Sequence, residues 1–372
     1  MSVLEFTFTA EEFERRRMAT CVLAHEVGAD VVLAFGENRS GVHVPYLTGW
    51  SVTRLAYVRL DADGCTMWVQ FHNHTPNAQR LAYRTDVRDV DDTMIDGLLG
   101  SNRIIATLGQ VPHPVRLAAQ ARDVELISID SAHNGLRLIK SIEEVEALRL
   151  GALASDAGAL ALIDACVPGA SDWDLLAAAR SAYTRMGGRD HICYICVTDM
   201  ENPDRDVPSQ VPEGRIVQRG SAITFELSAS ISPEYPGQIL RTVTIGEPTE
   251  DYVRLHEVAM TARASVRSVM KAGVPASALV DASACIEEAG FTTTDDLFHG
   301  LGMGYLEPIG TSASRIPPHI PATVLQAGMS IVVQPNVTFP NHGAGVQVGE
   351  MVIVTDDGFT DIHEVPAGMV TR

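Results

Sequence analysis

The sequence predicts an α/β domain over residues 1–137, followed by an α+β domain with an internal repeat over residues 138–372. Strand-like and helical patterns alternate through the first third of the chain, which favours a mixed or parallel sheet covered by helices. A helix start marks the junction, and two similar helical segments follow it. With 372 residues, of which 46% are hydrophobic and 20% charged, the chain is long and apolar enough for two folded domains.

The first domain is expected to begin with a helix over residues 10–27, followed by the apolar strand ADVVLAF. Further strands are predicted at residues 55–60 and 66–72 and in the segment VELISID, with short helices between them. Because VELISID is rich in apolar residues, we expect this strand to be buried.

A long helix is predicted to begin at the junction, near residues 134–141. Ser141 and Glu144 in SIEEVEALRL have the spacing of a capping box, in which the serine caps the first turn and the glutamate bonds back to it. The amphipathic pattern continues to about Cys166.

Two segments of the second domain share a pattern: CVPGASDWDLLAAARSAYTRMGG and KAGVPASALVDASACIEEAGF. Each has a Val/Pro/Gly turn and a helix that ends in Gly, and strands follow. The Gly-to-Gly spacing differs by one residue between Gly169–Gly187 and Gly273–Gly290. A duplicated unit that pairs about a pseudo-two-fold axis forms a cleft at the join, where sites often lie. The alternative is that two helix pairs share their turn chemistry by chance.

The formal net charge of −19 argues against nucleic acid or an anionic membrane as a partner, because both would repel the protein. The N-terminal segment MSVLEFTFTAEEFERRR has no apolar core of a signal peptide, and no run approaches the length of a membrane span. We expect a cytoplasmic protein that acts on a small molecule.

The six cysteines are scattered, and only Cys193 and Cys196 are close, in HICYICVT. A single CxxC without a second pair is weak evidence for zinc, and reduced cysteines are expected in the cytoplasm.

Glu226 and His299 are the candidate catalytic residues. Glu226 lies in the apolar strand ITFELSAS, where burial would raise its pKa as general bases and nucleophilic carboxylates require. The alternative is that Glu226 faces solvent. His299 lies in FHGLGMGYLEP, where the glycines direct its ring into open space, as suits a ligand or a proton carrier; a structural histidine is the alternative.

Further polar residues accompany these two. Gln334 and Glu350 lie in the apolar strands SIVVQPNVT and GVQVGEMVIVT and need polar partners, and Tyr305 and Glu307 follow His299 closely enough to line the same cavity. The loop over residues 200–214 is either a wall of the site or a solvated excursion.

Five segments resemble, in order, those of the pita-bread family of creatinase, aminopeptidase P, prolidase and methionine aminopeptidase. They are VPYLTGW, LRLIKSIEEVEALRLGA, FHGLGMGYLEP, LQAGMSIVVQPNV and VQVGEMVIVTDDG. The resemblance covers nearly the whole chain. It implies a creatinase/prolidase-type N-terminal domain followed by a pita-bread domain with an internal pseudo-two-fold repeat.

The metal-dependent members of this family bind two divalent ions through two Asp, one His and two Glu. The matching positions here hold Glu226, Gln238, His299, Gln334 and Gly349, with Glu350 one position later. A substrate-binding loop histidine of the family falls at Ser209, and the second histidine of the FHGLGMGYLEP segment falls at Leu306. Glutamine carbonyls are weak ligands, whereas hard divalent cations need several carboxylates. The resemblance therefore implies no metal and no other cofactor.

Within the family, the chain most resembles in character the metal-free members, such as creatinase and ectoine hydrolase. This resemblance implies a metal-independent hydrolase of a C–N bond (amide, amidine or guanidine) in a small non-peptide metabolite. Glu226 would be the general base or nucleophile, and His299 would donate a proton to the leaving nitrogen.

The remaining site residues have supporting roles in this hypothesis. Gln238 and Gln334 would orient the substrate, Glu350 would anchor a cationic group, and Tyr305 and Glu307 would line the pocket. The family resemblance also implies a homodimer in which Trp50 and Arg54 of the partner subunit close the cleft. Three alternatives remain: a lyase acting by β-elimination, an Xaa-Pro-type metallo-aminopeptidase with unusual ligands, and a non-catalytic binding protein.

Overall fold

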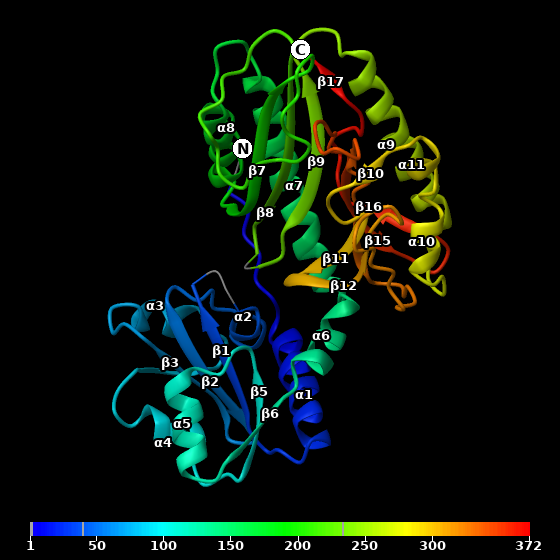
Figure 1. Cartoon of the computed structure of the whole chain (residues 1–372). Coiled ribbons are helices and arrows are strands. Elements are labelled where there is room, and N and C mark those ends of the chain that lie inside the picture. The colour runs from blue at the N-terminus through cyan, green and yellow to red at the C-terminus, as the bar shows by residue number, and fades with distance from the viewer. Residues whose placement is uncertain (1–2, 39–40, 233) are drawn as a thin grey trace. The chain divides into compact units, whose positions relative to one another are not determined.

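The structure is a computed structural model that describes residues 3–38, 41–232 and 234–372 (Figure 1). The chain forms two compact units. Residues 7–137 make up the first unit, and residues 3–6 join residues 138–372 in the second. Leu4 belongs to the second unit because its backbone N–H donates to the carbonyl of Met186 and its side chain packs on that unit's core. No helix of the described residues is long and apolar enough to cross a membrane.

The first unit is a mixed six-stranded sheet with helices, as the sequence predicts. Its helices are α1 (Ala10–Glu26), α2 (His43–Thr48), α3 (Thr75–Leu81), α4 (Met94–Leu99), α5 (His113–Ala121) and α6 (Asp130–Leu138). Its strands are β1 (Val32–Glu37), β2 (Leu55–Asp61), β3 (Gly64–Val69), β4 (Asp86–Asp89), β5 (Ile104–Leu108) and β6 (Glu125–Ser128). The strand order is β4-β3-β2-β1-β5-β6, with β1 and β3 antiparallel to β2 and the other pairs parallel.

The expectation that the segment VELISID is a buried strand is wrong in one respect. The strand exists as β6, but it is the edge strand of the sheet, and its Leu126 and Ile127 are only half-buried. An apolar run does not distinguish a central strand from an edge strand that packs on one face.

Within its described residues, the second unit contains a nine-stranded sheet, a two-stranded sheet and five helices. The helices are α7 (Ile142–Ala165), α8 (Asp172–Arg185), α9 (Glu250–Val269), α10 (Ser277–Asp281) and α11 (Cys285–Glu288). The strands are β7 (Arg189–Asp199), β8 (Ser221–Ser230), β9 (Gly237–Thr244), β10 (Thr292–Thr293), β11 (Phe298–Gly302), β12 (Gly304–Gly310), β13 (Ser330–Val333), β14 (Val337–Thr338), β15 (Gly349–Val354), β16 (Phe359–Asp361) and β17 (Val370–Thr371).

Helix α7 begins as predicted. Ser141 is its N-cap, the Ser141 hydroxyl accepts from the N–H of Glu144, and the Glu144 carboxylate accepts from the N–H of Ser141. This capping box satisfies two backbone donors that the first helical turn leaves without partners. Glu144 also accepts a hydrogen bond from the Tyr235 hydroxyl at 2.5 Å, which ties the start of α7 to the segment before β9.

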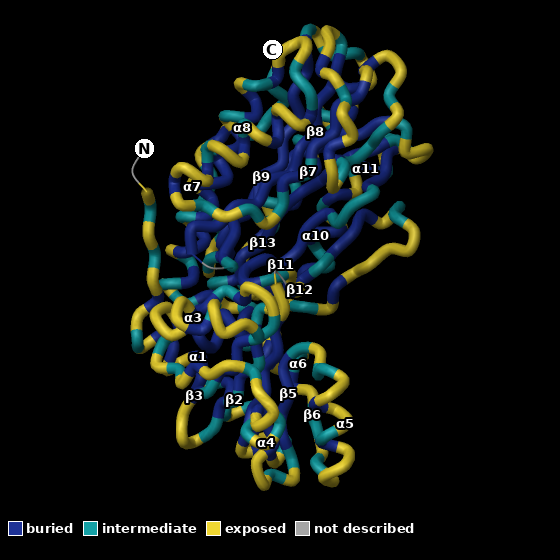
Figure 2. The backbone as a smooth tube through the Cα atoms, turned by 90° about the vertical axis from the view of Figure 1, so that its left-hand side faces the viewer, coloured by how far each residue is buried: buried dark blue, intermediate teal, exposed yellow. Residues whose placement is uncertain are grey.

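The large sheet has the strand order β12-β11-β13-β15-β9-β8-β7, and each neighbouring pair on this path is antiparallel. Its two halves have separate apolar cores. Helices α7 and α8 pack on β7–β9, and α9–α11 pack on the half that contains β13 and β15 (Figure 1). Strands β8, β9, β13 and β15 are buried along their whole length, and the tube is dark at β8, β9 and β13 (Figure 2). Each half thus has a helix group and paired strands, as the predicted repeat requires.

The strand register separates the residues of the large sheet into two faces. Residues that are paired directly across strands share a face, and successive residues alternate. Phe225 and Leu227 of β8 lie in the core beneath α7 and α8, so Glu226 lies on the opposite face. We call this opposite side the Glu226 face. Gly349 shares it, because Glu226 pairs with Leu240 and Leu240 pairs with Gly349.

Candidate functional site

Glu226 is held by a hydrogen-bonded pair of glutamine side chains on the Glu226 face. Nε2 of Gln238 donates to Oε1 of Glu226 at 2.8 Å and to Oε1 of Gln334 at 3.0 Å. All three side chains are buried, with exposed fractions of 9%, 1% and 2%. Three strand regions supply them: Glu226 lies on β8, Gln238 on β9, and Gln334 directly after β13. The structure therefore brings together three residues that the sequence analysis selected from distant segments.

Glu226 has an environment that favours the protonated carboxyl group. Burial is the main cause, and the nearby carboxylates of Asp295 and Asp296 add to it, so that the pKa of Glu226 is raised to about 8. Burial and the charge of Asp296 also raise the pKa of Asp295. At neutral pH, Glu226 thus carries its proton. Because Oε1 already accepts from Gln238, that proton belongs on Oε2.

Sequence reasoning missed Asp295 and Asp296. They stand three and four positions before His299 in DDLFHG, so a signal was present. Charged pairs of this kind are common on solvated loops, and the sequence does not reveal that strand β11 carries this pair to Glu226. The electrostatic effect of the two aspartates on Glu226 arises only in the folded sheet.

His299 lies on β11 and is buried, with 2% of its surface exposed. It pairs with Val332, which pairs with Met351, two residues beyond Gly349 and therefore on the Glu226 face. Its Nδ1 lies 3.1 Å from the carbonyl oxygen of Gly300. Burial lowers the pKa of His299 to about 4, although this carbonyl and the Gln334 side chain both favour the charged ring. His299 is therefore neutral at neutral pH.

Tyr305 of β12 covers the His299 ring. The two ring centroids are 4.1 Å apart, with 24° between the ring planes. The Tyr305 hydroxyl donates a short hydrogen bond to Asp296, and burial together with this carboxylate raises the pKa of Tyr305. Half of the Tyr305 surface is exposed, so this side chain lies between His299 and solvent. Its expected place beside His299 agrees with the structure.

Glu350 does not have the expected role of anchoring a cationic substrate group. It pairs with Ile239 and Val333 and lies on the helix-covered face, away from Glu226. Its carboxylate is held by Arg241 (3.0 Å), Arg263 (2.8 Å) and Arg267 (2.7 Å). Burial would raise the pKa of Glu350, but these arginines outweigh it and lower the pKa. The one-residue step from Gly349 to Glu350 reverses the face, because side chains alternate along a strand.

We call Glu226, Gln238, Gln334, His299 and Tyr305 the Glu226 cluster. Three other predicted residues lie outside it. Glu307 is exposed, and its carboxylate accepts from the N–H of Ile309 at 3.0 Å. In the first unit, Trp50 is buried with 2% of its surface exposed, which does not fit a ring that one subunit presents to another. Arg54 is exposed.

Most residues of the loop over residues 200–214 are exposed or half-buried, and hydrogen bonds hold the loop in place. Ser209 forms a backbone bridge with Ile195 of β7, and its hydroxyl donates to Glu213 at 3.0 Å. Asp199, at the end of β7, accepts two backbone N–H groups and so caps a turn. The hydrogen bonds of Ser209 and Asp199 therefore serve the loop itself.

The residues at the family's metal positions do not fit a dinuclear metal centre. Gln334 replaces a carboxylate, and its Oε1 is already used by Gln238. Gly349 has no side chain, and a Cβ there would lie 2.4 Å from the Val333 carbonyl oxygen and 2.8 Å from the Gln334 Cα. Within residues 3–38, 41–232 and 234–372, no group of three or more His, Cys, Asp or Glu side chains could hold a metal ion. One carboxyl group and one imidazole are too few ligands for two hard cations.

The CxxC cysteines also give no metal site. Cys193 and Cys196 are buried and unpaired, and burial raises the pKa of each thiol to about 12. A thiol with this pKa is not a nucleophile at neutral pH, and among the described residues these cysteines are not part of a group of three or more metal-ligating side chains.

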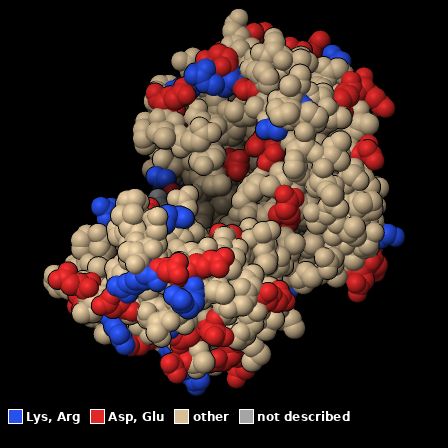
Figure 3. All heavy atoms as spheres, turned by 60° about the horizontal axis from the view of Figure 1, so that its bottom comes forward, with Lys and Arg blue, Asp and Glu red and all other residues tan. Residues whose placement is uncertain are grey.

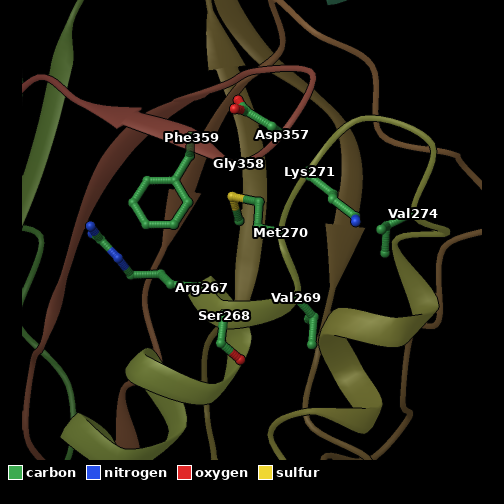
Figure 4. A pocket seen from close by; sticks show the side chains of 9 residues that line it. All are labelled: Arg267, Ser268, Val269, Met270, Lys271, Val274, Asp357, Gly358 and Phe359. Atoms are coloured by element: carbon green, nitrogen blue, oxygen red, sulfur yellow. The ribbon is translucent and has the colours of Figure 1, made fainter.

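A surface hollow beside α9 is separate from the Glu226 cluster. Arg267, Lys271, Asp357 and Phe359 are among its lining residues, and Figure 4 shows the Phe359 ring facing the Arg267 side chain. Arg267 already binds Glu350 and Asp361, and its guanidinium lies 4.3 Å from the Phe359 ring centroid. Elsewhere on the surface, basic and acidic side chains are interspersed on the face that Figure 3 presents. Neither feature competes with the Glu226 cluster as a candidate active site.

The second unit has the pita-bread fold, and residues 146–356 match the metallopeptidase family M24, a family of hydrolases. The chain belongs to this family. It is 24% identical to an Xaa-Pro dipeptidase of Pyrococcus furiosus over 324 residues, which cover 85% of this chain and 89% of the dipeptidase. It is 26% identical over 240 residues to a probable dipeptidase PepE of Mycobacterium tuberculosis, covering 63% of this chain and 61% of PepE.

Solved structures confirm the fold class. The prolidase from Pyrococcus furiosus superimposes with a TM-score of 0.77 at 22% identity, covering 93% of this chain and 99% of the prolidase. The X-Pro aminopeptidase from Thermotoga maritima MSB8 gives a TM-score of 0.83 at 20% identity, covering 96% of this chain and 99% of the aminopeptidase. The predicted α/β domain followed by a pita-bread domain is therefore correct.

Proposed function

We propose that this M24-family hydrolase cleaves a C–N bond in a small, non-peptide amide, amidine or guanidine without a dinuclear metal centre. In this respect it would resemble metal-free relatives such as creatinase more than the dipeptidases. One observation carries the proposal: the Gln238 amide bonds both Glu226 and Gln334 at positions where metal-dependent relatives need carboxylate ligands. Hydrogen bonds between neutral amides and a neutral carboxyl group replace ionic ligation there.

The protonation states reverse the roles that the sequence analysis assigned. Glu226, with its pKa raised to about 8, holds a proton at neutral pH, whereas His299, with its pKa lowered to about 4, is free to accept one. Glu226 is therefore the proton donor to the leaving nitrogen, and His299 is the general base. At neutral pH the proposed acid is protonated and the proposed base is not, as the two roles require.

The reaction then balances through these two side chains. His299 takes a proton from the attacking water as its oxygen bonds to the substrate carbon, and Glu226 gives its Oε2 proton to the nitrogen as the C–N bond breaks. Transfer of the proton from His299 to the Glu226 carboxylate restores the starting state. The Gln238 bond to Oε1 stabilises the carboxylate that forms during the reaction.

The test is hydrolysis of a panel of small amides, amidines and guanidines by metal-depleted protein. Glu226→Gln keeps the shape and the bond from Gln238 but removes the acidic proton, so the rate should fall by about 10²-fold or more. Glu247→Gln changes an exposed carboxylate of the same unit and should leave the rate unchanged. Full activity of the Glu226→Gln variant would exclude the assigned role.

The named relatives support a second candidate, hydrolysis of an Xaa-Pro peptide bond, because they include Xaa-Pro dipeptidases. The same assay distinguishes the two candidates when Xaa-Pro dipeptides are included with and without added Mn²⁺ or Co²⁺. Dipeptide cleavage that requires metal would favour the second candidate. Cleavage of non-peptide substrates by chelator-treated protein would favour the first.

A further inference from the structure

The hairpin formed by β11 and β12 contains an irregularity beside His299. His299 pairs with Ile309, but the next residue, Gly300, pairs with Leu306, so that the partner strand has extra residues at this point. Such bulges change the direction of side chains relative to a regular ladder. Here the result is that Tyr305 stacks on His299, although its direct partner in the ladder is Leu301.

Gly300 permits this arrangement. A Cβ at Gly300 would lie 2.3 Å from the Glu307 carbonyl oxygen and 2.8 Å from the Leu306 carbonyl oxygen. No real Cβ tolerates such contacts with backbone atoms, so β12 could not approach β11 as closely with any other residue. The glycine that follows His299 therefore serves the approach of β12 and with it the position of Tyr305.

A hydrogen bond to the segment before β11 fixes the Tyr305 hydroxyl. The hydroxyl donates to Asp296, which lies just before β11, and the N–H of Asp296 donates to Asp295 at 2.9 Å. Tyr305 thus reaches across the His299 ring from β12 back to the chain segment that leads into β11. A flat ring that is held at its hydroxyl end cannot turn away from the imidazole without breaking this bond.

We propose that Asp296 and Tyr305 are positioning residues, which together hold the His299 ring in the orientation that proton transfer needs. In the proposed reaction, the imidazole must face both the attacking water and Glu226, and it has few partners of its own. Nδ1 contacts the Gly300 carbonyl, and the Gln334 side chain interacts with the ring. The Tyr305 ring restricts its rotation from the remaining side. This inference rests on the proposed function for its catalytic meaning, but the geometry can be measured without a substrate.

The experiment is NMR of the full chain with histidine labelled at Cε1, in which a His299→Asn sample identifies the His299 signal among the twelve histidines. In the wild type, the stacked Tyr305 ring should displace this signal upfield. Tyr305→Phe keeps the ring but loses the bond to Asp296, and Asp296→Ala removes the acceptor. Both variants should lose most of the upfield shift. Asp296→Asn retains an acceptor oxygen and should restore it.

The matched control is Tyr183→Phe. Tyr183 donates to Asp190 at 2.7 Å in the same unit, so this variant removes the same kind of bond away from His299 and should leave the His299 signal in place. The signals of other buried histidines, such as His363, show whether each variant is folded. If both Tyr305→Phe and Asp296→Ala retain the wild-type His299 shift while folded, packing alone holds the ring and the proposal fails. This outcome is independent of whether any substrate is hydrolysed.

Discussion

Nε2 of Gln238 lies 2.8 Å from Oε1 of Glu226, and this bond determines where the Glu226 proton can be. An amide nitrogen only donates, so Oε1 must be an acceptor in both protonation states of the carboxyl group. The second acceptor of the same nitrogen, Oε1 of Gln334, fixes the orientation of both amides. Two neutral side chains thus align an acidic group that burial keeps protonated.

The activity should have a bell-shaped pH dependence with limbs near the pKa values of His299 and Glu226. The rate falls below a pH of about 4 because His299 becomes protonated, and it falls above a pH of about 8 because Glu226 loses the proton that it donates. Asp295→Asn removes a negative charge near Glu226, lowers its pKa and should move the alkaline limb to lower pH. Profiles of kcat/KM for both proteins test this. An unchanged alkaline limb in the variant would contradict the assignment to Glu226.

Restoring acidic ligands should increase metal affinity. We expect the double variant Gln238→Asp, Gln334→Glu to bind Co²⁺ more tightly than the wild type in calorimetric titrations, because carboxylates return at two ligand positions. Gly349 should still limit the site, since a Cβ there would meet the Val333 carbonyl oxygen. Asp206→Asn provides a control for a general change in acidity. Tight binding of two Co²⁺ per wild-type chain would show that the present ligands suffice and would refute the metal-free reading.

The sequence was sufficient for the domain order, the capping box at Ser141 and the choice of Glu226, Gln238 and Gln334 as neighbours. These follow from local chemistry and from motif order, which are both visible in the chain. The face of the sheet on which Glu350 lies could not be predicted from the sequence. Motif alignment places a residue along a strand, but the strand register decides which face its side chain is on. The expected role of Trp50 at the cleft of a partner subunit does not fit the structure for a related reason. A motif does not show whether a ring is buried.

The proposed direction of proton transfer could not be predicted either. It depends on Asp295 and Asp296, whose charges reach Glu226 only across the assembled sheet, and on the burial of His299 beneath Tyr305. The glycine-rich context of His299 had indicated open space for its ring. In the structure, Gly300 instead lets β12 approach and close that space.

Removing Arg241 should strongly destabilise the second unit. Its guanidinium is 1% exposed, contacts Glu350, and donates to the backbone carbonyls of Gly349 and Val365. Arg241→Met removes the donor to these two carbonyl groups and one of the three arginines that bind the buried Glu350, so the free energy of unfolding should fall by about 3–5 kcal/mol. Arg103→Met removes an exposed contact to Asp123 and should cost less than about 1 kcal/mol. Urea denaturation measures the free energy of unfolding of both variants. Equal losses of stability in the two variants would contradict a structural role for the buried Arg241.

The first unit should lose stability in acid because of His133. Its side chain is fully buried beside His43 and Tyr46, with ring centroids 5.0 Å away in both cases, and burial lowers its pKa to about 2. The unfolded chain takes up a proton below a pH of about 6.5, whereas the folded unit does not until about 2. Stability is therefore complete above pH 6.5 and decreases as the pH falls, by about 1.4 kcal/mol per pH unit for this one group.

His133→Phe fills the same space without a titrating group and should remove this part of the pH dependence. Between pH 6.5 and pH 5, the wild type should lose about 2 kcal/mol more of its free energy of unfolding than the variant does. Urea denaturation followed by the fluorescence of Trp50 and Trp68 reports on this unit. His25→Gln, which changes an exposed histidine of the same unit, should keep the wild-type dependence. Parallel curves for the wild type and His133→Phe would mean that His133 is protonated in the folded protein, against its burial.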